Sequence, residues 1–102
     1  MDELIRGTTP SYNFVDFGFD AGNITAATFI VKQAKNVIIE KELADATVSE
    51  DAVRWTLTQA ETLRLDAKLP AVIYCIWKNG ETRGESQRLT VEVRDTDKNE
   101  EM

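Results

Sequence analysis

The fold is decided by the stretch AVIYCIWKNGETRGESQRLTVEVR, residues 71–94, in which two apolar runs flank a turn. The first run, 71–78, is apolar at every position before its final lysine, which predicts a central strand with two buried faces. One face holds Ile73, Cys75 and Trp77, and the other holds Val72, Tyr74 and Ile76. The second face must therefore be covered either by the same chain or by a partner.

The turn that follows this strand is the strongest local signal in the sequence. Asn79 and Gly80 are the residue types that take positive φ in a type I′ turn, so they predict a β-hairpin. The strand after the turn is predicted to run from about Glu81 to Arg94, with Gly84 as a candidate β-bulge. Its apolar residues alternate with polar ones, so one face is buried and the other is in water. The side chains of the buried face are Leu89, Val91 and Val93.

The two-residue period recurs upstream of the hairpin. A strand over 24–33 is predicted to place Ala27, Phe29 and Val31 in the core, and a further strand is predicted over 37–43. The strand over 52–57 has the core face Val53, Trp55 and Leu57. The aromatic segment 12–19 changes parity near Asp16, which indicates a bulge or a switch between sheets.

One helical element interrupts the strands. Thr58-Gln59-Ala60-Glu61 is a capping box, in which Thr58 and Glu61 each bond the backbone amide of the other. The helix must end before Pro70, so it is short. Together the elements predict an all-β fold, an immunoglobulin-like two-sheet antiparallel sandwich of six to seven strands with one short helical turn.

The chain of 102 residues fits one domain, which we assign to residues 1–94. Residues 95–102 contain four acidic side chains and one lysine, which is half of the net charge of −6. Such a segment has little to bury, so we expect an acidic, disordered tail.

Several kinds of chemistry are excluded by composition. The chain has no histidine, which rules out a Ser-His-Asp triad and any His-ligated zinc or haem. Its single cysteine, Cys75, can form neither an intramolecular disulfide nor a Cys-only metal cluster, and its apolar neighbours predict an inert thiol. We therefore expect no catalytic site, no metal and no cofactor.

Charge and hydropathy narrow the range of partners. A net charge of −6 argues against nucleic acid, because phosphate binding needs clustered Lys and Arg. No apolar stretch is long enough to span a membrane. The N-terminal residues 1–6 have neither a basic region nor an apolar core, so a signal peptide is not predicted.

Two surfaces remain as candidates for binding. The first is the face of Ile73, Cys75 and Trp77, or the opposite face of the same strand, which is a subunit interface if the chain does not cover it. The second is Trp55 with Trp77, which could stack on sugar rings, although both occupy core-parity positions. Burial in the core is the favoured interpretation of the two tryptophans.

The chain resembles a group of small proteins of phages and prophages of Gram-positive gut bacteria. The resemblance rests on IRGTTP at 5–10 with Tyr12 and Phe14, on WTLTQAETL at 55–63, and on the last strand. The residues that carry it in that strand region are Gly84, Ser86, Val91 and Val93. Their spacing is similar to the N-terminal β-sandwich domain of phage baseplate upper proteins, which anchors receptor-binding machinery to the tail.

The resemblance implies a non-enzymatic structural protein of a phage virion, tail or baseplate, acting through protein–protein contacts. Its partners would be further copies of itself or other tail proteins, and it would reside in the bacterial cytoplasm during assembly or in the virion. Two alternatives stay open: a small glycan- or peptide-binding module, and an acidic inhibitor of a host protein.

Overall fold

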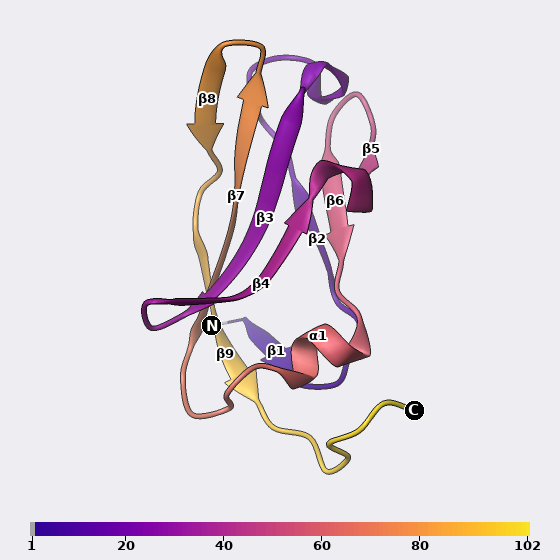
Figure 1. Ribbon diagram of the computed structural model, residues 1–102, viewed down its shortest axis with the longest axis vertical. Coiled ribbons are helices and arrows are strands. Elements are labelled where there is room, and N and C mark those ends of the chain that lie inside the picture. The colour runs from indigo at the N-terminus through magenta and orange to yellow at the C-terminus, as the bar shows by residue number, and fades with distance from the viewer. Residues whose placement is uncertain (1) are drawn as a thin grey trace.

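A computed structural model describes residues 2–102 and shows a sandwich of two β-sheets (Figure 1). The large sheet has six strands in the order β1-β9-β7-β3-β4, with β8 also paired to β7. Its strands are β1 (Glu3–Ile5), β3 (Ala26–Gln33), β4 (Asn36–Glu42), β7 (Ala71–Asn79), β8 (Thr82–Glu85) and β9 (Leu89–Arg94). The predicted central strand is β7, which has neighbours on both sides.

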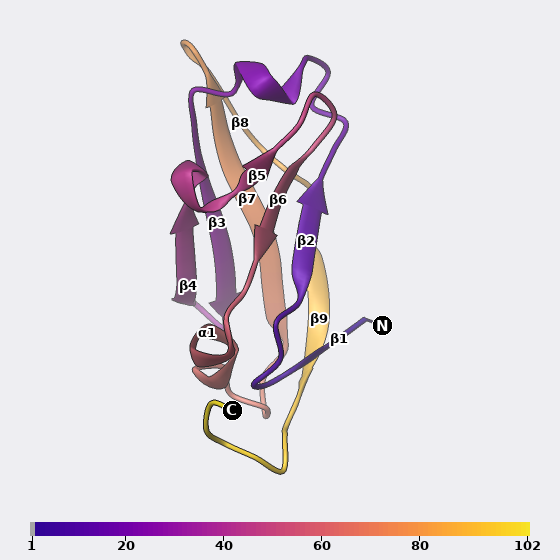
Figure 2. The same cartoon turned by 90° about the vertical axis from the view of Figure 1, so that its right-hand side faces the viewer.

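The small sheet has three strands in the order β2-β6-β5. Its strands are β2 (Ser11–Phe14), β5 (Thr47–Val48) and β6 (Val53–Thr56). Figure 2 shows this sheet facing β3 and β7, with β9 at the side of β2. A three-stranded sheet cannot cover the whole inner face of a six-stranded one, and this mismatch decides where the molecule is open.

The core lies between the sheets and is built from the predicted faces. Phe29 and Val31 of β3, Val53 and Trp55 of β6, and Leu57 after β6 are fully buried. Trp55 stacks on Phe29 with ring centroids 5.4 Å apart, and Phe14 meets both rings edge-on. The all-β two-sheet sandwich is thus confirmed, and so are the inward faces of these strands.

The count of elements differs from the prediction. Residues 2–102 form nine strands, because β1 and β5 are very short and the strand expected over 81–94 is divided into β8 and β9. The helical elements are α1 (Gln59–Leu63) and two 3₁₀ turns, η1 (Ala21–Asn23) and η2 (Leu43–Asp45). Both 3₁₀ turns lie in loops that composition alone does not distinguish from irregular chain.

The division of the last strand comes from a bulge, but not at Gly84. β8 pairs Glu85 with Ile76, whereas β9 pairs Leu89 with Ile73. Three residues on one strand therefore oppose two on the other, which places the extra residue within 86–88. Gly84 has a different role, because a Cβ at this position would overlap the ring of Trp77.

The hairpin between β7 and β8 is present, with its turn one residue later than predicted. Asn79 is paired with Thr82, so Gly80 and Glu81 form the two-residue loop. Only Gly80, with φ of +61°, has positive φ in this loop. That pattern fits a type II′ turn, which needs glycine at its first central position only, so the type I′ prediction is wrong.

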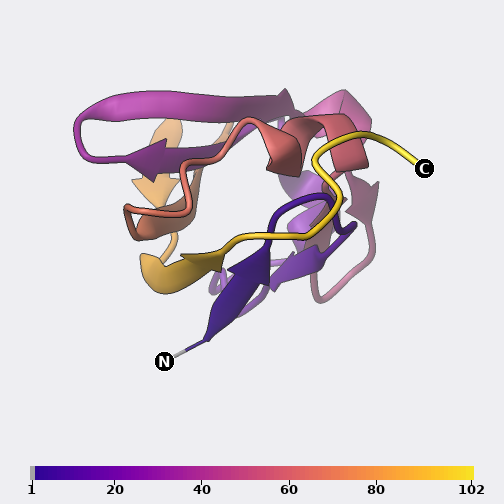
Figure 3. The same ribbon diagram turned by 90° about the horizontal axis from the view of Figure 1, so that it is seen from below.

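The two ends of the chain lie together. β1 pairs with β9 in parallel, whereas the other strand pairs of residues 2–102 are antiparallel (Figure 3). Beyond β9, the Arg6 guanidinium donates to Asp95 at 2.6 Å and to Asn99 at 2.7 Å. The Met102 amide donates to Gln59 of α1 at 2.7 Å. Residues 95–102 run beside β1 and α1 without regular secondary structure, and their disorder stays a prediction.

Candidate functional site

The predicted interface residues Ile73 and Cys75 lie in the sandwich core. Each side chain is only 1% exposed, so neither can form a subunit interface, and this corrects the prediction. The parity of β7 is as predicted, but the small sheet of the same chain covers this face. Burial raises the pKa of the Cys75 thiol to about 11, against the opposing effect of its bonds with Ser86. An uncharged, buried thiol is unreactive.

The third predicted interface residue, Trp77, lies at the rim of the core. It is partly exposed and packs edge-on against Phe19 and Phe17, at centroid distances of 5.1 and 6.1 Å. The indole also lies across Gly84, the residue directly opposite on β8. Trp55 is fully buried, and its Nε1 donates to the Glu42 carbonyl at 3.0 Å. A sugar platform made of both tryptophans is therefore excluded, and only Trp77 is accessible.

The opposite face of β7 has no second layer over it. Tyr74 is nevertheless only 6% exposed, because the Arg88 guanidinium lies 4.2 Å from its ring centroid. Ile30 of the neighbouring strand is also buried on this side, and Val72 and Ile76 are half-buried. The long Arg88 side chain thus shields Tyr74 within the chain itself.

A groove of about 400 Å³ lies between β2 and the β8–β9 strand. Ile73 and Trp77 line it from the core side. One wall is the segment 12–17, and the other wall is formed by Glu85, Ser86, Gln87 and Leu89. We call this feature the groove. Its volume lies within the range of ligand pockets, about 300–1,000 Å³.

Leu89 shows why the groove is open. It has the same parity as Val91 and Val93, which are buried, yet 38% of Leu89 is exposed. The small sheet ends at β2, so no strand lies opposite this part of the large sheet. Val15, just beyond β2, is 53% exposed on the other wall. The groove therefore lies where a further strand of the small sheet, next to β2, would pack on the large sheet.

The groove is acidic at its walls. Asp16 and Glu85 are its charged lining residues, and no Lys or Arg lines it. Burial, helped by the charge of Asp2, raises the pKa of Tyr12 to about 12, so the phenol stays neutral. Asp16 has a φ of +61°, a conformation uncommon outside glycine, and the predicted change of parity lies at this residue.

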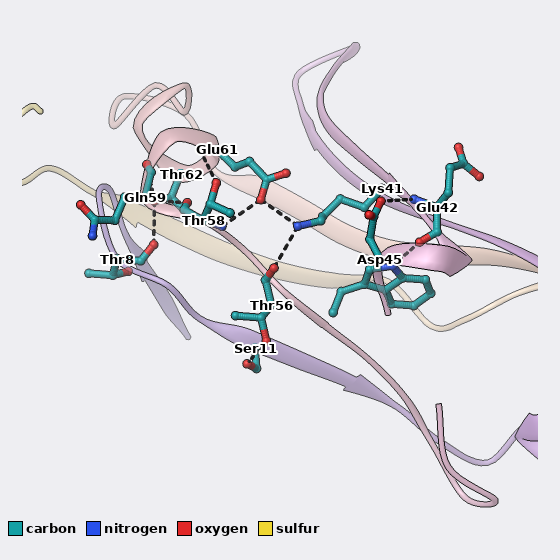
Figure 4. Close-up of polar contacts among 11 residues, drawn as sticks. Thr8, Ser11, Lys41, Glu42, Asp45, Thr56, Thr58, Gln59, Glu61 and Thr62 are labelled. Atoms are coloured by element: carbon teal, nitrogen blue, oxygen red, sulfur yellow. Dashed lines mark hydrogen bonds and ion pairs between the residues drawn. The ribbon is translucent and has the colours of Figure 1, made fainter. Parts of the chain in front are cut away.

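The opposite flank, which we call the closed flank, is held by bonds between the sheets (Figure 4). Lys41 of β4 donates to the Thr56 carbonyl of β6 and to the Glu61 carboxylate of α1, both at 3.0 Å. Thr58 and Glu61 form the predicted capping box. The Glu61 amide donates to the Thr58 hydroxyl at 3.1 Å, and the Thr58 amide donates to the Glu61 carboxylate at 2.8 Å. The structural roles predicted for these two residues are confirmed.

Electrostatics support the same bonds on the closed flank. Burial alone would raise the pKa of Glu61, but the Thr58 amide and the Lys41 ammonium outweigh it and hold that pKa below the ordinary value of 4.5. The carboxylate is therefore a structural anion that fixes α1 to the sandwich, rather than an acid available for proton transfer.

Other classes of site lack support in residues 2–102. Within this range, no group of three or more acidic, His or Cys side chains could hold a metal ion. No helix of the same range is both long and apolar enough to cross a bilayer. Sequence reasoning missed the groove, although the parity of Leu89 and the break at Asp16 were both visible in the sequence.

No protein-family model matches the chain, and no curated protein matches it. The resemblance to phage baseplate upper proteins therefore stays a prediction, and the assignment of a function rests on the groove.

Proposed function

We propose that this chain is a non-enzymatic protein-interaction domain that works in assembly through the groove. The observation that carries the proposal is the exposure of Leu89, a core-parity side chain, beside the free edge of β2. Contiguous apolar surface on a protein is a usual sign of a binding site. Asp16, Glu85 and Gln87 form a polar rim around this surface, which is also typical of protein interfaces.

The resemblance to phage proteins supplies a setting for this proposal. In a phage virion, tail or baseplate, the groove would receive a neighbouring subunit, either another tail protein or a further copy of this chain. Small structural domains of this kind need no catalytic group, and the groove brings together apolar and acidic side chains without a nucleophile–base pair.

Site-specific cross-linking in the producing cells tests the proposal. A photoreactive amino acid replaces Val15 or Leu89 in the groove, and the matched control replaces Val37, which is 49% exposed on β4. We expect one discrete cross-linked product from each groove position and none from Val37. Mass spectrometry of the product distinguishes a second copy from a different protein. Equal smears from all three positions, or no product from the groove, would refute the proposal.

A glycan-binding module is the second candidate, favoured by one observation. Trp77 and Tyr12 both line the groove, and carboxylates that can accept bonds from sugar hydroxyls lie nearby. This function predicts a change of Trp77 fluorescence with oligosaccharides, while the buried Trp55 gives a constant background. A glycan panel that leaves the emission unchanged counts against it. An inhibitor of a host protein would appear as a host protein cross-linked to the groove.

A further inference from the structure

We propose that the groove is an acceptor site for a β-strand: an extended segment of a protein partner adds to the free edge of β2 as a fourth strand of the small sheet. The segment carries apolar side chains at alternate positions and basic residues at its ends. This inference rests on the proposed function and specifies the chemistry of the partner. The backbone edge, the uncovered side chains and the charge of the groove each support it.

The backbone of β2 has unpaired groups on the groove side. The Leu57 amide donates to the Pro10 carbonyl at 2.9 Å, which fixes the register of bonded pairs between β2 and β6. Bonded pairs alternate along an antiparallel ladder, so Tyr12 and Phe14 bond β6, while the amides and carbonyls of Ser11 and Asn13 point away from it. These groups are a ready template for one more strand.

The accessible side chains next to this edge, Leu89 and Trp77, could be covered by a strand whose alternate side chains face them. A strand added to β2 would turn every second side chain toward the large sheet, above Leu89 and Trp77. Leu89 already has inward parity, so apolar residues at alternate positions would bury it as Val91, of the same parity, is already buried. A helix or a flat ligand would leave the amides of β2 unpaired.

The free edge of the large sheet at β4 shows what a protected edge looks like in this chain. Lys41 occupies an inward-facing position of β4, opposite Phe29, and the pairing with β3 shifts at Val31, which indicates a bulge. Inward charges and bulges are devices that prevent a further strand from pairing. In β2 the inward positions are Tyr12 and Phe14, and its pairing with β6 has no register shift.

Charge argues for a basic segment and against a second copy of this chain. The groove has Asp16 and Glu85 on its walls and no basic lining residue. A second copy carries a net charge of −6 and would bring its own carboxylates to the contact. Like charges across an interface are unfavourable, whereas lysine or arginine at the ends of the incoming strand would pair with these acids.

Peptide binding to the full chain tests the inference directly. The probe is a short peptide with valine and leucine at alternate positions, threonine between them and a lysine at each end. One control has the same composition in an order without alternation, and another has glutamate at each end. We expect the probe to shift the amide signals of residues 11–17 and 85–89 and to change the Trp77 emission. The dissociation constants of both controls should be at least about tenfold higher than that of the probe.

Two variants separate strand addition from simple apolar contact. Asn13→Pro removes an amide that points into the groove, and proline is tolerated at such edge positions, so the fold is retained. The matched control is Val48→Pro on β5, the other edge of the small sheet. The Ser49 amide bonds the Ala52 carbonyl at 2.9 Å, so by alternation the Val48 amide also points away from β6. We expect Asn13→Pro to abolish binding of the probe and Val48→Pro to leave it unchanged.

Each other outcome overturns the inference in a distinguishable way. If the reordered peptide binds as tightly as the alternating probe, the groove is an apolar surface without strand addition. The same conclusion follows if Asn13→Pro binds the probe as tightly as the wild type does. If the wild type forms a dimer that Asn13→Pro disrupts, the occupant is a second copy. If no peptide binds at millimolar concentration while cross-linking from Val15 persists in Asn13→Pro, strand addition is wrong and the assembly function stands. Loss of both signals in the wild type refutes both proposals.

Discussion

The two flanks of the sandwich differ in how the small sheet meets the large one: the closed flank is bonded, and the flank with the groove, which we call the open flank, is not. On the closed flank, Lys41 and the Trp55 indole bridge the sheets by hydrogen bonds, and α1 covers the end. On the open flank, no hydrogen bond within residues 2–102 joins β2 to β8 or β9, and Leu89 and Val15 face solvent across the groove. The difference teaches that the bonds between the sheets and the proposed binding surface lie on separate sides of one core.

Removing the large ring that ties the closed flank should have the largest effect. Trp55→Ala empties a fully buried site beside Phe29 and Phe14, so we expect a loss of about 3–5 kcal/mol in the free energy of unfolding. Trp55→Phe keeps a ring but leaves the Glu42 carbonyl without its donor, which should cost about 1–3 kcal/mol. Urea denaturation measures both. Equal losses for the two variants would contradict the importance of the ring.

The second test alters the contact between Gly84 of β8 and the Trp77 ring, on the open flank. Gly84→Ala places a Cβ against the Trp77 ring, which must move, so we expect a loss of about 1–3 kcal/mol and a red-shifted emission. The control is the same substitution in a Trp77→Ala background, where the obstacle is gone. If the cost of Gly84→Ala is unchanged there, the contact with Trp77 does not explain the glycine.

The ion pair of the closed flank predicts a pH dependence. The pKa of Glu61 is below 4.5 in the folded chain, so its stabilising contribution is complete above the unfolded-state pKa and is lost as the pH falls through the folded-state value. Lys41→Met should cost about 1–2 kcal/mol at neutral pH and reduce this loss in acid. Denaturation midpoints from neutral to acid pH test this.

The exposed Lys35→Met serves as the matched control for this substitution. It should change neither the stability at neutral pH nor its dependence on acid. A Lys41→Met variant with the acid profile of the wild type would show that Glu61 is stabilised by the Thr58 amide alone.

The smallest effect on stability is expected in the groove. Leu89→Thr removes apolar surface that the folded chain only partly buries, so the free energy of unfolding should change by less than about 0.5 kcal/mol. Cross-linking from Val15 to the partner should nevertheless fall. The matched substitution Val91→Thr, two residues further on the same face, should be clearly destabilising because Val91 is buried. A large destabilisation by Leu89→Thr would show that the groove is part of the core.

The sequence predicted the features that depend on local chemistry. The alternation in β6 and β9, the two apolar faces of β7 and the capping box of Thr58 and Glu61 all follow from neighbours within a few residues. The turn at Gly80 is predicted one residue early, because pairing of Asn79 with Thr82 depends on the whole hairpin register. Parity alone also cannot tell which face of β7 points inward.

The candidate site depended on pairings between distant residues. Whether Leu89 is buried is decided by the number of strands in the opposite sheet, which no local pattern encodes. The parallel pairing of β1 with β9 joins the two ends of the sequence, and the apolar run over 71–78 suggested a surface that the small sheet in fact covers. The groove thus results from the different numbers of strands in the two sheets.

The parallel pair of β1 and β9 also has a mechanical consequence. Its strands run in the same direction, so tension applied through Asp2 and Arg94 acts along the ladder and loads its hydrogen bonds in shear, all at once. Tension applied between Asp2 and the Gly80 turn would pull at an angle to the same ladder and break its bonds one after another. Single-molecule stretching should therefore find a higher rupture force for the first pair of attachment points. The pair of β1 and β9 would therefore resist tension between these two points more strongly than its small number of residues suggests.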